Sequence, residues 1–392
     1  MKALSMAFCL FFQIAIAQSI VQLPAEPIFL TEKSIVYTQL SSYGLSESKT
    51  DISALSGANP ALIAGYKRAE VSLAYQFDLE DEIRSDPFVG RGLIALPQGL
   101  TIVYPFNSLV LLAGFDQRSN GQIGPLPITT NTDLDGNAQS GKYVKTHAVL
   151  AATAGIGFST DRFAGTEGRW NLGLRMNANY FRLREEFGQL NSSADAVFPS
   201  IHTGIEFQWG TERKPAFSVS LYGDFNPEFT YTRDVELPSA MRTVDSLGNR
   251  DQEVIAFRQS VEGKMPDRFG LSALLQPWKR YSIFADVNTL RISEVDYTFI
   301  SFTDRLDFGL GAIAQLADDL HLSSGVYNSR VSSKSSEVLR SESIDLPTLF
   351  LSHGLGIKYG KLSGSLAVLY SMDADFFTRD RFEIKSGFSV EL

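Results

Sequence analysis

The chain has 392 residues, of which 44% are hydrophobic and 20% are charged, a composition that excludes a disordered chain. Its formal net charge of -9 argues against nucleic acid as a partner. Its 28 Phe and 14 Tyr favour strands over helices, and its length suits two average domains or one large all-β barrel.

The N-terminus has the pattern of a secretory signal peptide. Lys2 supplies a positive charge, an apolar stretch extends to Ile16, and the residues A-I-A end at Ala17. The alternative, a buried or membrane helix, is disfavoured because the stretch is too short to span a bilayer. We therefore expect residues 1-17 to be removed. Cys9 is the chain's single cysteine, so the mature chain is expected to have no disulfide and no thiol chemistry.

Residues 18-68 precede the first predicted strand. They contain "SALSGANPALIAGY", a patch of small residues around Asn59, Pro60 and Ala61. Pro60 fixes a bend and pushes Asn59 away from helical geometry, and small residues allow close backbone approach. Composition alone leaves two interpretations open: a turn that leads into the first strand, or part of a compact segment folded against other elements.

From there to the C-terminus, apolar and polar residues alternate with a period of two. "NLGLRMNANYF", for example, places Leu172, Leu174 and Met176 on one face of a strand and Gly173 and Arg175 on the other. We expect about fourteen strands, which are 69-79, 93-104, 108-118, 143-158, 169-183, 199-209, 215-225, 266-277, 280-292, 303-316, 319-330, 349-359, 361-371 and 382-391.

The connections between these strands alternate between short and long. Short ones include "PFN", "GTERK", "WK", "AD" and Gly360 alone, whereas 119-142, 184-199, 226-265 and 331-348 are long. A soluble β-sandwich, the alternative fold, gives no reason for this pattern. An outer-membrane barrel has short periplasmic turns and long extracellular loops, and closure leaves no unpaired edge in lipid. The sequence thus predicts an all-β fold, a transmembrane antiparallel β-barrel of about 14 strands over 69-392.

The two faces of the strands support this prediction. The apolar face would contact lipid, while a charge in mid-bilayer costs about 2–4 kcal/mol and is expected to point into the lumen. Aromatic residues near strand ends, such as Trp170, Trp209 and Trp278, suit the interfacial girdles. The predicted lumen-facing polar residues are Asp78, Asp116, Arg175, Glu206, Asp224, Asp286, Asp307, Glu383 and Lys385.

A barrel of this size also bears on the patch before the first strand. About eight strands already enclose an interior that side chains can fill, so a barrel of about fourteen leaves an open bore. A compact segment folded inward would obstruct it. We therefore expect residues 18-68 to form a hatch, with Asn59, Pro60 and Ala61 as hatch or gating residues.

Four stretches resemble the long-chain fatty acid transporter (FadL/TodX) family of outer-membrane proteins. They are "ALSGANPALIA", "LPQGLTIVYPFNSLVLLAGF", "MPDRFGLSALLQPWKRYSIFADVNTL" and "DLPTLFLSHGLGIKYGKLSGSLAVLY". The resemblance covers most of the mature chain and implies a fourteen-strand barrel with an N-terminal hatch and passive uptake of hydrophobic molecules. Leu62 departs from the glycine usual after Asn-Pro-Ala, and related barrels serve secretion systems as shuttles or anchors.

Enzymatic chemistry has little support in the sequence. None of His147, His202, His321 and His353 belongs to an HExxH motif, no G-x-S-x-G follows a strand, and His202 and His321 suit polar positions in a lumen. "NTDLDGN" offers oxygen ligands at alternate positions but lacks the distal Glu of an EF-hand loop, so a solvated loop is favoured over a Ca²⁺ site. We expect no catalytic residue, no metal and no cofactor.

The predicted function is therefore an outer-membrane channel or transporter for passive uptake of hydrophobic small molecules of the long-chain fatty acid or hydrocarbon type. An interaction barrel that serves a secretion or surface-attachment system is the alternative, and an outer-membrane hydrolase barrel is a second one. The expected location is the outer membrane of a Gram-negative bacterium, multi-pass, with both termini periplasmic. The expected partners are outer-membrane lipids, a hydrophobic ligand and the barrel-assembly machinery, and a monomer is expected.

Overall fold

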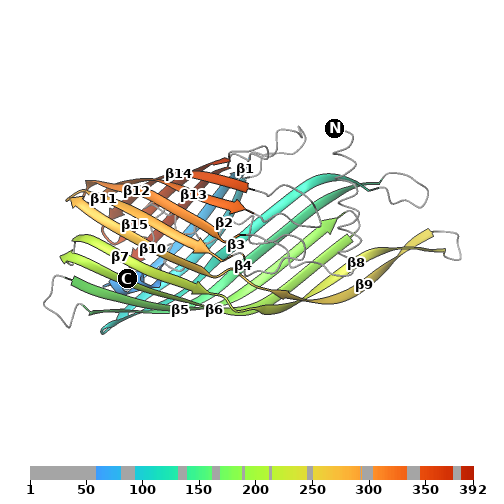
Figure 1. Cartoon of the computed structure of the whole chain (residues 1–392), viewed down its shortest axis with the longest axis horizontal. Helices are drawn as coiled ribbons and strands as arrows, with labels where there is room; N and C mark the ends of the chain where they lie inside the picture. The colour runs from blue at the N-terminus through green and yellow to red at the C-terminus, as the bar shows by residue number, and fades with distance from the viewer. Residues whose placement is uncertain are drawn as a thin grey trace.

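The computed structural model describes residues 59–80, 93–130, 139–160, 168–187, 190–211, 214–244, 250–291, 293, 303–332, 345–373 and 381–392 (Figure 1). The predicted signal peptide (1-17) and most of the predicted hatch segment (18-68) lie outside these residues.

A 3-10 helix, η3 (Pro60–Gly65), precedes sixteen strands. The strands are β1 (Glu70–Glu80), β2 (Leu93–Phe106), β3 (Leu109–Thr130), β4 (Gln139–Ser159), β5 (Gly168–Phe187), β6 (Leu190–Thr211), β7 (Lys214–Phe225), β8 (Phe229–Val244), β9 (Arg250–Gly263), β10 (Arg268–Trp278), β11 (Tyr281–Leu290), β12 (Arg305–Ala317), β13 (Leu320–Ser332), β14 (Asp345–Tyr359), β15 (Leu362–Asp373) and β16 (Arg381–Glu391).

Fourteen of the strands close into an antiparallel barrel, as the sequence predicted. The first and last strands pair along their full length, with Leu73 opposite Phe388, and β10 pairs directly with β7. Pairing of β5 with β6 completes the ring. Because every strand of the ring has two neighbours, the backbone hydrogen bonds are satisfied without an open sheet edge.

The remaining two strands, β8 and β9, form a hairpin beside the ring. Residues 191–195 of β6 pair with 232–236 of β8, and β8 pairs with β9. Figure 1 shows the hairpin reaching beyond the end of the barrel where β3 and β4 also extend. The expectation of a long connection over 226-265 is wrong, because β8 and β9 lie within it. Phe229, Tyr231 and Val235 are buried while Thr230 and Thr232 are exposed, a period-two pattern that we did not read as a strand.

The strands on one side of the barrel are long. β3, β4, β5 and β6 contain 22, 21, 20 and 22 residues, against 11 and 10 in β10 and β11. The predicted polar loops 119-142 and 184-199 are therefore strand at 119–130, 139–142, 184–187 and 190–199. About ten tilted residues cross the hydrocarbon layer, so pairing continues where lipid no longer imposes an apolar face. The stretch "NTDLDGN" (131–137) lies outside the described residues.

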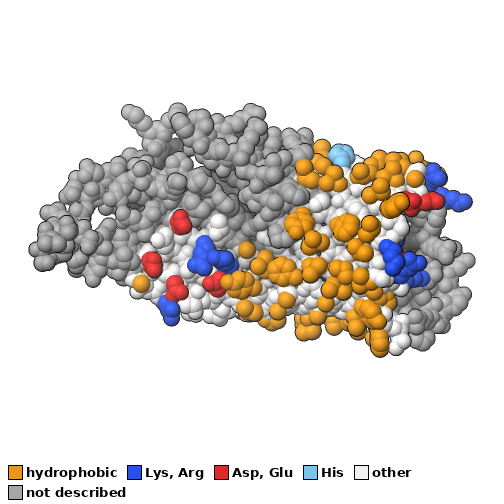
Figure 2. All heavy atoms as spheres, turned by 180° about the vertical axis from the view of Figure 1, so that it is seen from behind, with side chains coloured by type: hydrophobic (Ala, Val, Ile, Leu, Met, Phe, Trp, Pro, Cys, Tyr) orange, Lys and Arg blue, Asp and Glu red, His pale blue; other side chains and the backbone are white. Residues whose placement is uncertain are grey.

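The outer surface carries the apolar face of the strands. Figure 2 shows hydrophobic side chains over one half of the surface and charged ones mostly beyond them. Large aromatic side chains are exposed near strand ends: Tyr104, Phe106, Trp170, Trp209, Trp278, Tyr281 and Tyr359. Such an arrangement is typical of an apolar band bordered by an aromatic girdle. No helix among the described residues is long and apolar enough to cross a membrane.

Candidate functional site

The patch before the first strand forms a compact turn. Asn59 has extended geometry (φ -55°, ψ 120°), and its Oδ1 accepts a hydrogen bond from the backbone N–H of Ala61 at 3.0 Å. Pro60 occupies the first position of η3, where its missing N–H and fixed φ are tolerated. Leu62 N donates to Asn59 O at 3.1 Å, and the helix ends before the extended Tyr66. Asn59 therefore acts as an N-cap that fixes the bend.

This turn is buried against the inner face of the barrel. Asn59, Ala61 and Ile63 have no exposed surface. Ile63 belongs to an apolar cluster with Val103 of β2 and with Val110 and Leu112 of β3. The three predicted hatch residues thus lie together in one buried element, and their role in gating stays a prediction.

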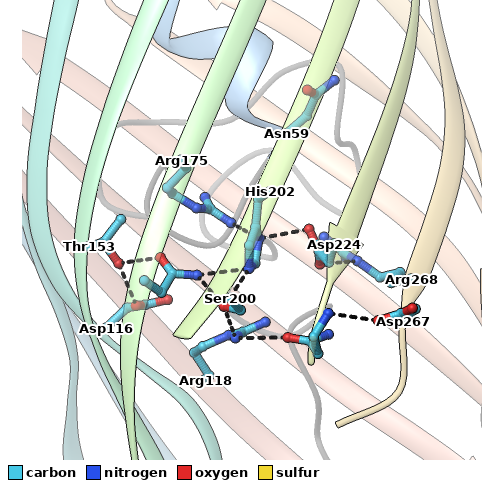
Figure 3. Close-up of polar contacts among 12 residues, drawn as sticks. Asn59, Asp116, Arg118, Thr153, Arg175, Ser200, His202, Asp224, Asp267 and Arg268 are labelled. Atoms are coloured by element: carbon cyan, nitrogen blue, oxygen red, sulfur yellow. Dashed lines mark hydrogen bonds and ion pairs between the residues drawn. The ribbon is translucent and has the colours of Figure 1, made fainter. Parts of the chain in front are cut away.

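Alternate residues along β5, β6, β7 and β10 carry buried polar side chains. One row of paired residues crosses these four strands: Arg175 lies opposite His202, His202 opposite Asp224, and Asp224 opposite Arg268. The neighbours of Arg175 and His202 along the chain are exposed on the outer surface, so the row lies on the inner face (Figure 3). Each of the four side chains is 1% exposed.

The row is linked by ion pairs and hydrogen bonds. Arg268 Nε donates to Asp224 Oδ2 at 2.8 Å, and His202 Nδ1 lies 2.7 Å from Asp224 Oδ1. Arg175 Nη2 lies 2.5 Å from the same His202 nitrogen. Buried charges are costly unless they are paired and hydrogen-bonded. Asp224 is therefore the group that compensates the charge of the Arg268 guanidinium.

A second row extends the network to β3 and β4. Arg118 Nη1 donates to Asn179 Oδ1 and Ser200 Oγ, both at 2.9 Å. Thr153 Oγ1 donates to Asn177 Oδ1 at 2.9 Å and lies 3.4 Å from Asp116 Oδ1. The connected polar groups therefore span β3, β4, β5, β6, β7 and β10 (Figure 3).

The other predicted lumen residues lie outside this network. Glu206 is buried and accepts from Asn171 Nδ2 at 2.9 Å, and Asp286 is buried. Asp307 is buried beside Arg305. Asp78 pairs with Glu383 and Gln76 with Lys385 between β1 and β16, but the side chains of Asp78, Glu383 and Lys385 are not described.

Sequence reasoning missed several residues of the network: Arg118, Thr153, Asn177, Asn179, Ser200, Asn226 and Arg268. A signal was present, because Asn177 and Asn179 follow Arg175 at intervals of two on one face of β5. His202 is buried on the inner face, and His321 lies on the inner face opposite Gly356, so both positions agree with the expectation. His353 is exposed. Charge alone selected the predicted set, so neutral polar residues on the same face were left out.

Ser200, His202 and Asp224 lie in the order of an acyl-transfer triad, with Ser200 Oγ 3.3 Å from His202 Nε2. The serine is 1% exposed, and its oxygen accepts hydrogen bonds from three neighbouring side chains. A nucleophile needs an accessible oxygen and a free lone pair. The arrangement therefore connects strands and presents no nucleophile. Among the described residues, no group of three or more His, Cys, Asp and Glu is placed to hold a metal ion.

An apolar cluster lies next to the network, where the β8–β9 hairpin joins the barrel. Phe181 of β5 and Phe198 of β6 pack against Phe229 and Tyr231 of β8. The rings of Phe198 and Phe229 stack with centroids 4.0 Å apart. Since Phe181 follows Asn179 by two residues, polar and aromatic surfaces are adjacent on the same inner face.

No protein-family model matches the chain, and no curated protein matches it. Solved structures do match. The CymD monoaromatic hydrocarbon channel is 10% identical with a TM-score of 0.58, covering 92% of this chain and 97% of its own. The toluene transporter TodX of Pseudomonas putida is 13% identical with a TM-score of 0.57, covering 92% and 98%. A FadL homologue of Pseudomonas aeruginosa is 10% identical with a TM-score of 0.55, covering 86% and 94%. At these identities the likeness shows the fold, and the resemblance stated from the sequence is confirmed at that level.

Proposed function

We propose that the chain is an outer-membrane channel for the passive uptake of hydrophobic small molecules, and that its N-terminal segment obstructs the bore at rest. The observation that carries this proposal is the turn at Asn59–Gly65, buried on the inner wall of a closed fourteen-strand barrel. A barrel of this width is not filled by its own side chains, so a segment folded inward has a clear physical role.

The cargo class is supported by the likeness of fold. CymD is described as a monoaromatic hydrocarbon channel and TodX as a toluene transporter, and both share this fold. The aromatic cluster of Phe181, Phe198, Phe229 and Tyr231 is buried, so it packs the β8–β9 hairpin against the barrel and carries no argument about the cargo.

The location and orientation follow from the same barrel. Its exposed apolar band and aromatic strand ends suit a bilayer. The two ends of the barrel sequence are neighbours, because Leu392 N donates to Ala69 O at 2.9 Å. Both lie at the end with short connections, which supports periplasmic termini. We propose that the chain acts as a monomer surrounded by outer-membrane lipids and is inserted by the barrel-assembly machinery.

Uptake into proteoliposomes tests the proposal. Labelled toluene and oleate should enter vesicles that contain the folded protein faster than protein-free vesicles, with saturable initial rates. Sucrose is the matched polar control and should not enter faster. Equal rates for the apolar probes with and without protein would remove the channel function, and a stable protein complex recovered on mild extraction would then favour an interaction barrel.

A further inference from the structure

Three glycines form a row on the inner wall beneath the buried turn. Gly157 of β4 lies opposite Gly173 of β5, and Gly173 lies opposite Gly204 of β6. Their chain neighbours Ile156 and Leu172 are exposed on the outer surface, so the glycines face inward. Three adjacent strands thus expose bare backbone at one level of the inner wall.

The turn occupies the space that side chains would need at these positions. A Cβ atom built on Gly157 would lie 2.4 Å from Ala64 N, and one built on Gly173 would lie 2.0 Å from Pro60 O. A Cβ atom on Gly204 would lie 1.9 Å from Asn59 Oδ1. Real carbon contacts are far longer, and backbone atoms of a capped turn cannot rotate away. Only glycine is compatible with the observed position of the turn.

Other inward glycines of the barrel have a different environment. A Cβ atom on Gly270 would lie 2.1 Å from the ring of Tyr222, a side chain of the wall itself. A Cβ atom on Gly356 of β14 would lie 2.0 Å from His321 Cε1, again a side chain of the wall. Close contact with the N-terminal turn is therefore a property of the row on β4, β5 and β6, and it is not shared by these two glycines.

We propose that Gly157, Gly173 and Gly204 are positioning residues that form a seat for the turn Asn59–Gly65, and that occupation of this seat keeps the turn on the inner wall. The inference deepens the proposed function and rests on it, because the seat would determine in what fraction of the molecules the N-terminal segment is held on the inner wall. Substitution of one of these glycines by alanine adds a methyl group that displaces the turn, and it leaves the outer face of the barrel unchanged.

The Gly204 contact allows a specific test, because the atom that a Cβ on Gly204 would meet is Asn59 Oδ1, a side-chain atom that a substitution can remove. Gly204→Ala introduces a methyl group against Asn59 Oδ1, and Asn59→Ala removes that oxygen. If Gly204 acts through the turn, the effects of the two substitutions on how firmly the turn is held at the wall are strongly non-additive. Gly356→Ala is the matched control, since it creates a similar clash, with His321, in a part of the wall away from the turn.

The readout is the rate at which a maleimide labels Ala61→Cys in the folded barrel, in a chain that also carries Cys9→Ser. Ala61 has no exposed surface, so labelling reports departure of the turn from the wall. Gly204→Ala should raise the labelling rate about tenfold or more, which corresponds to a loss of about 1.4 kcal/mol in the free energy that holds the turn at the wall. The double variant with Asn59→Ala should label like Asn59→Ala alone, and Gly356→Ala should label like the parent.

Multiplicative effects of Gly204→Ala and Asn59→Ala on the labelling rate, or equal effects of Gly204→Ala and Gly356→Ala, would overturn the seat. If Gly204→Ala prevents folding, recovery of the heat-modifiable barrel in the double variant supports the seat, and failure to recover overturns it. The uptake assay separates this inference from the proposed function. Labelling as expected without uptake of toluene or oleate would leave the seat standing and remove the channel.

Discussion

The two sides of the barrel differ on the inside far more than on the outside. Both present alternating apolar residues outward, as at Leu174 on β5 and Leu355 on β14. On the inner face, β3 to β7 carry Arg118, Arg175 and other large polar groups around the turn. The inner face of β13 to β15 instead carries mostly small groups, among them Ser323, Ser352, Gly354 and Ala367.

This comparison shows that lipid and lumen impose different constraints. The bilayer requires the same outer face all round, so the outer pattern repeats from strand to strand. The inner face is free to differ, because each part needs only to satisfy its own polar groups. The network therefore lies on the side where the N-terminal turn rests, and substitutions should have unequal effects on the two sides.

Loss of the last strand should have the largest effect, since it breaks the ring that both sides share. Deleting 382–392 leaves β1 and β15 without their partner strand. Unpaired backbone groups in lipid cost several kcal/mol each, so no folded barrel should form. Heat-modifiable migration on gels is the measurement, with deletion of Leu392 alone as the milder control. Normal migration of the truncated chain would contradict the closure described for β1 and β16.

Asp224→Ala should have the next largest effect. It leaves the buried Arg268 and its neighbours without their compensating carboxylate, which costs about 3–5 kcal/mol. Denaturant unfolding in detergent measures the free energy of unfolding. Asp234→Ala is the control, because the Arg258–Asp234 pair is exposed and such a pair contributes only about 0–1 kcal/mol. Similar losses for both variants would mean that the network does not stabilise this side of the barrel.

Ala61→Phe should overpack the contact between the turn and the wall. The expected loss in the free energy of unfolding is about 1–3 kcal/mol, because Ala61 is fully buried. Ala152→Phe on the same side of the barrel is the control, since Ala152 is exposed on the outer surface. Stability equal to that of the control variant would show that the turn is not packed as described.

The same substitution at two serines gives the smallest and most direct contrast between the sides. Ser200 Oγ accepts from three side chains, so Ser200→Ala leaves buried donors unsatisfied at about 1–3 kcal/mol. Ser352 Oγ is buried and has no hydrogen-bond partner among the described residues. Ser352→Ala should therefore cost nothing or stabilise slightly. Equal unfolding free energies for the two variants would show that the serines on the two sides of the barrel do not differ in their contribution to stability.

Much of the fold could be predicted from the sequence, because alternation and connection length are local signals. The closed ring followed from them, while the β8–β9 hairpin did not. Beyond the lipid the outer face turns polar, as at Thr232 and Asp234, so the contrast that reveals a strand weakens. The glycine row was equally hidden, since strand register determines that Gly157, Gly173 and Gly204 align.

The candidate site was predictable only in part. Asp116, Arg175 and Asp224 stand out as charges in apolar-patterned strands, and burial of a charge implies a partner. The pairing of β7 with β10 followed from the sequence, because 215-225 and 266-277 are consecutive predicted strands of the barrel. The register that places Arg268 opposite Asp224 did not follow, because connection length does not determine which residues of two strands are paired.

The central claim is that the N-terminal segment, held at the turn on the inner wall, obstructs the bore. Planar-bilayer conductance of the parent and of a chain lacking residues 18-60 tests it most directly. The account predicts a quiet parent and an ion-conducting deletion variant, both heat-modifiable on gels. The same conductance with and without the segment would contradict it.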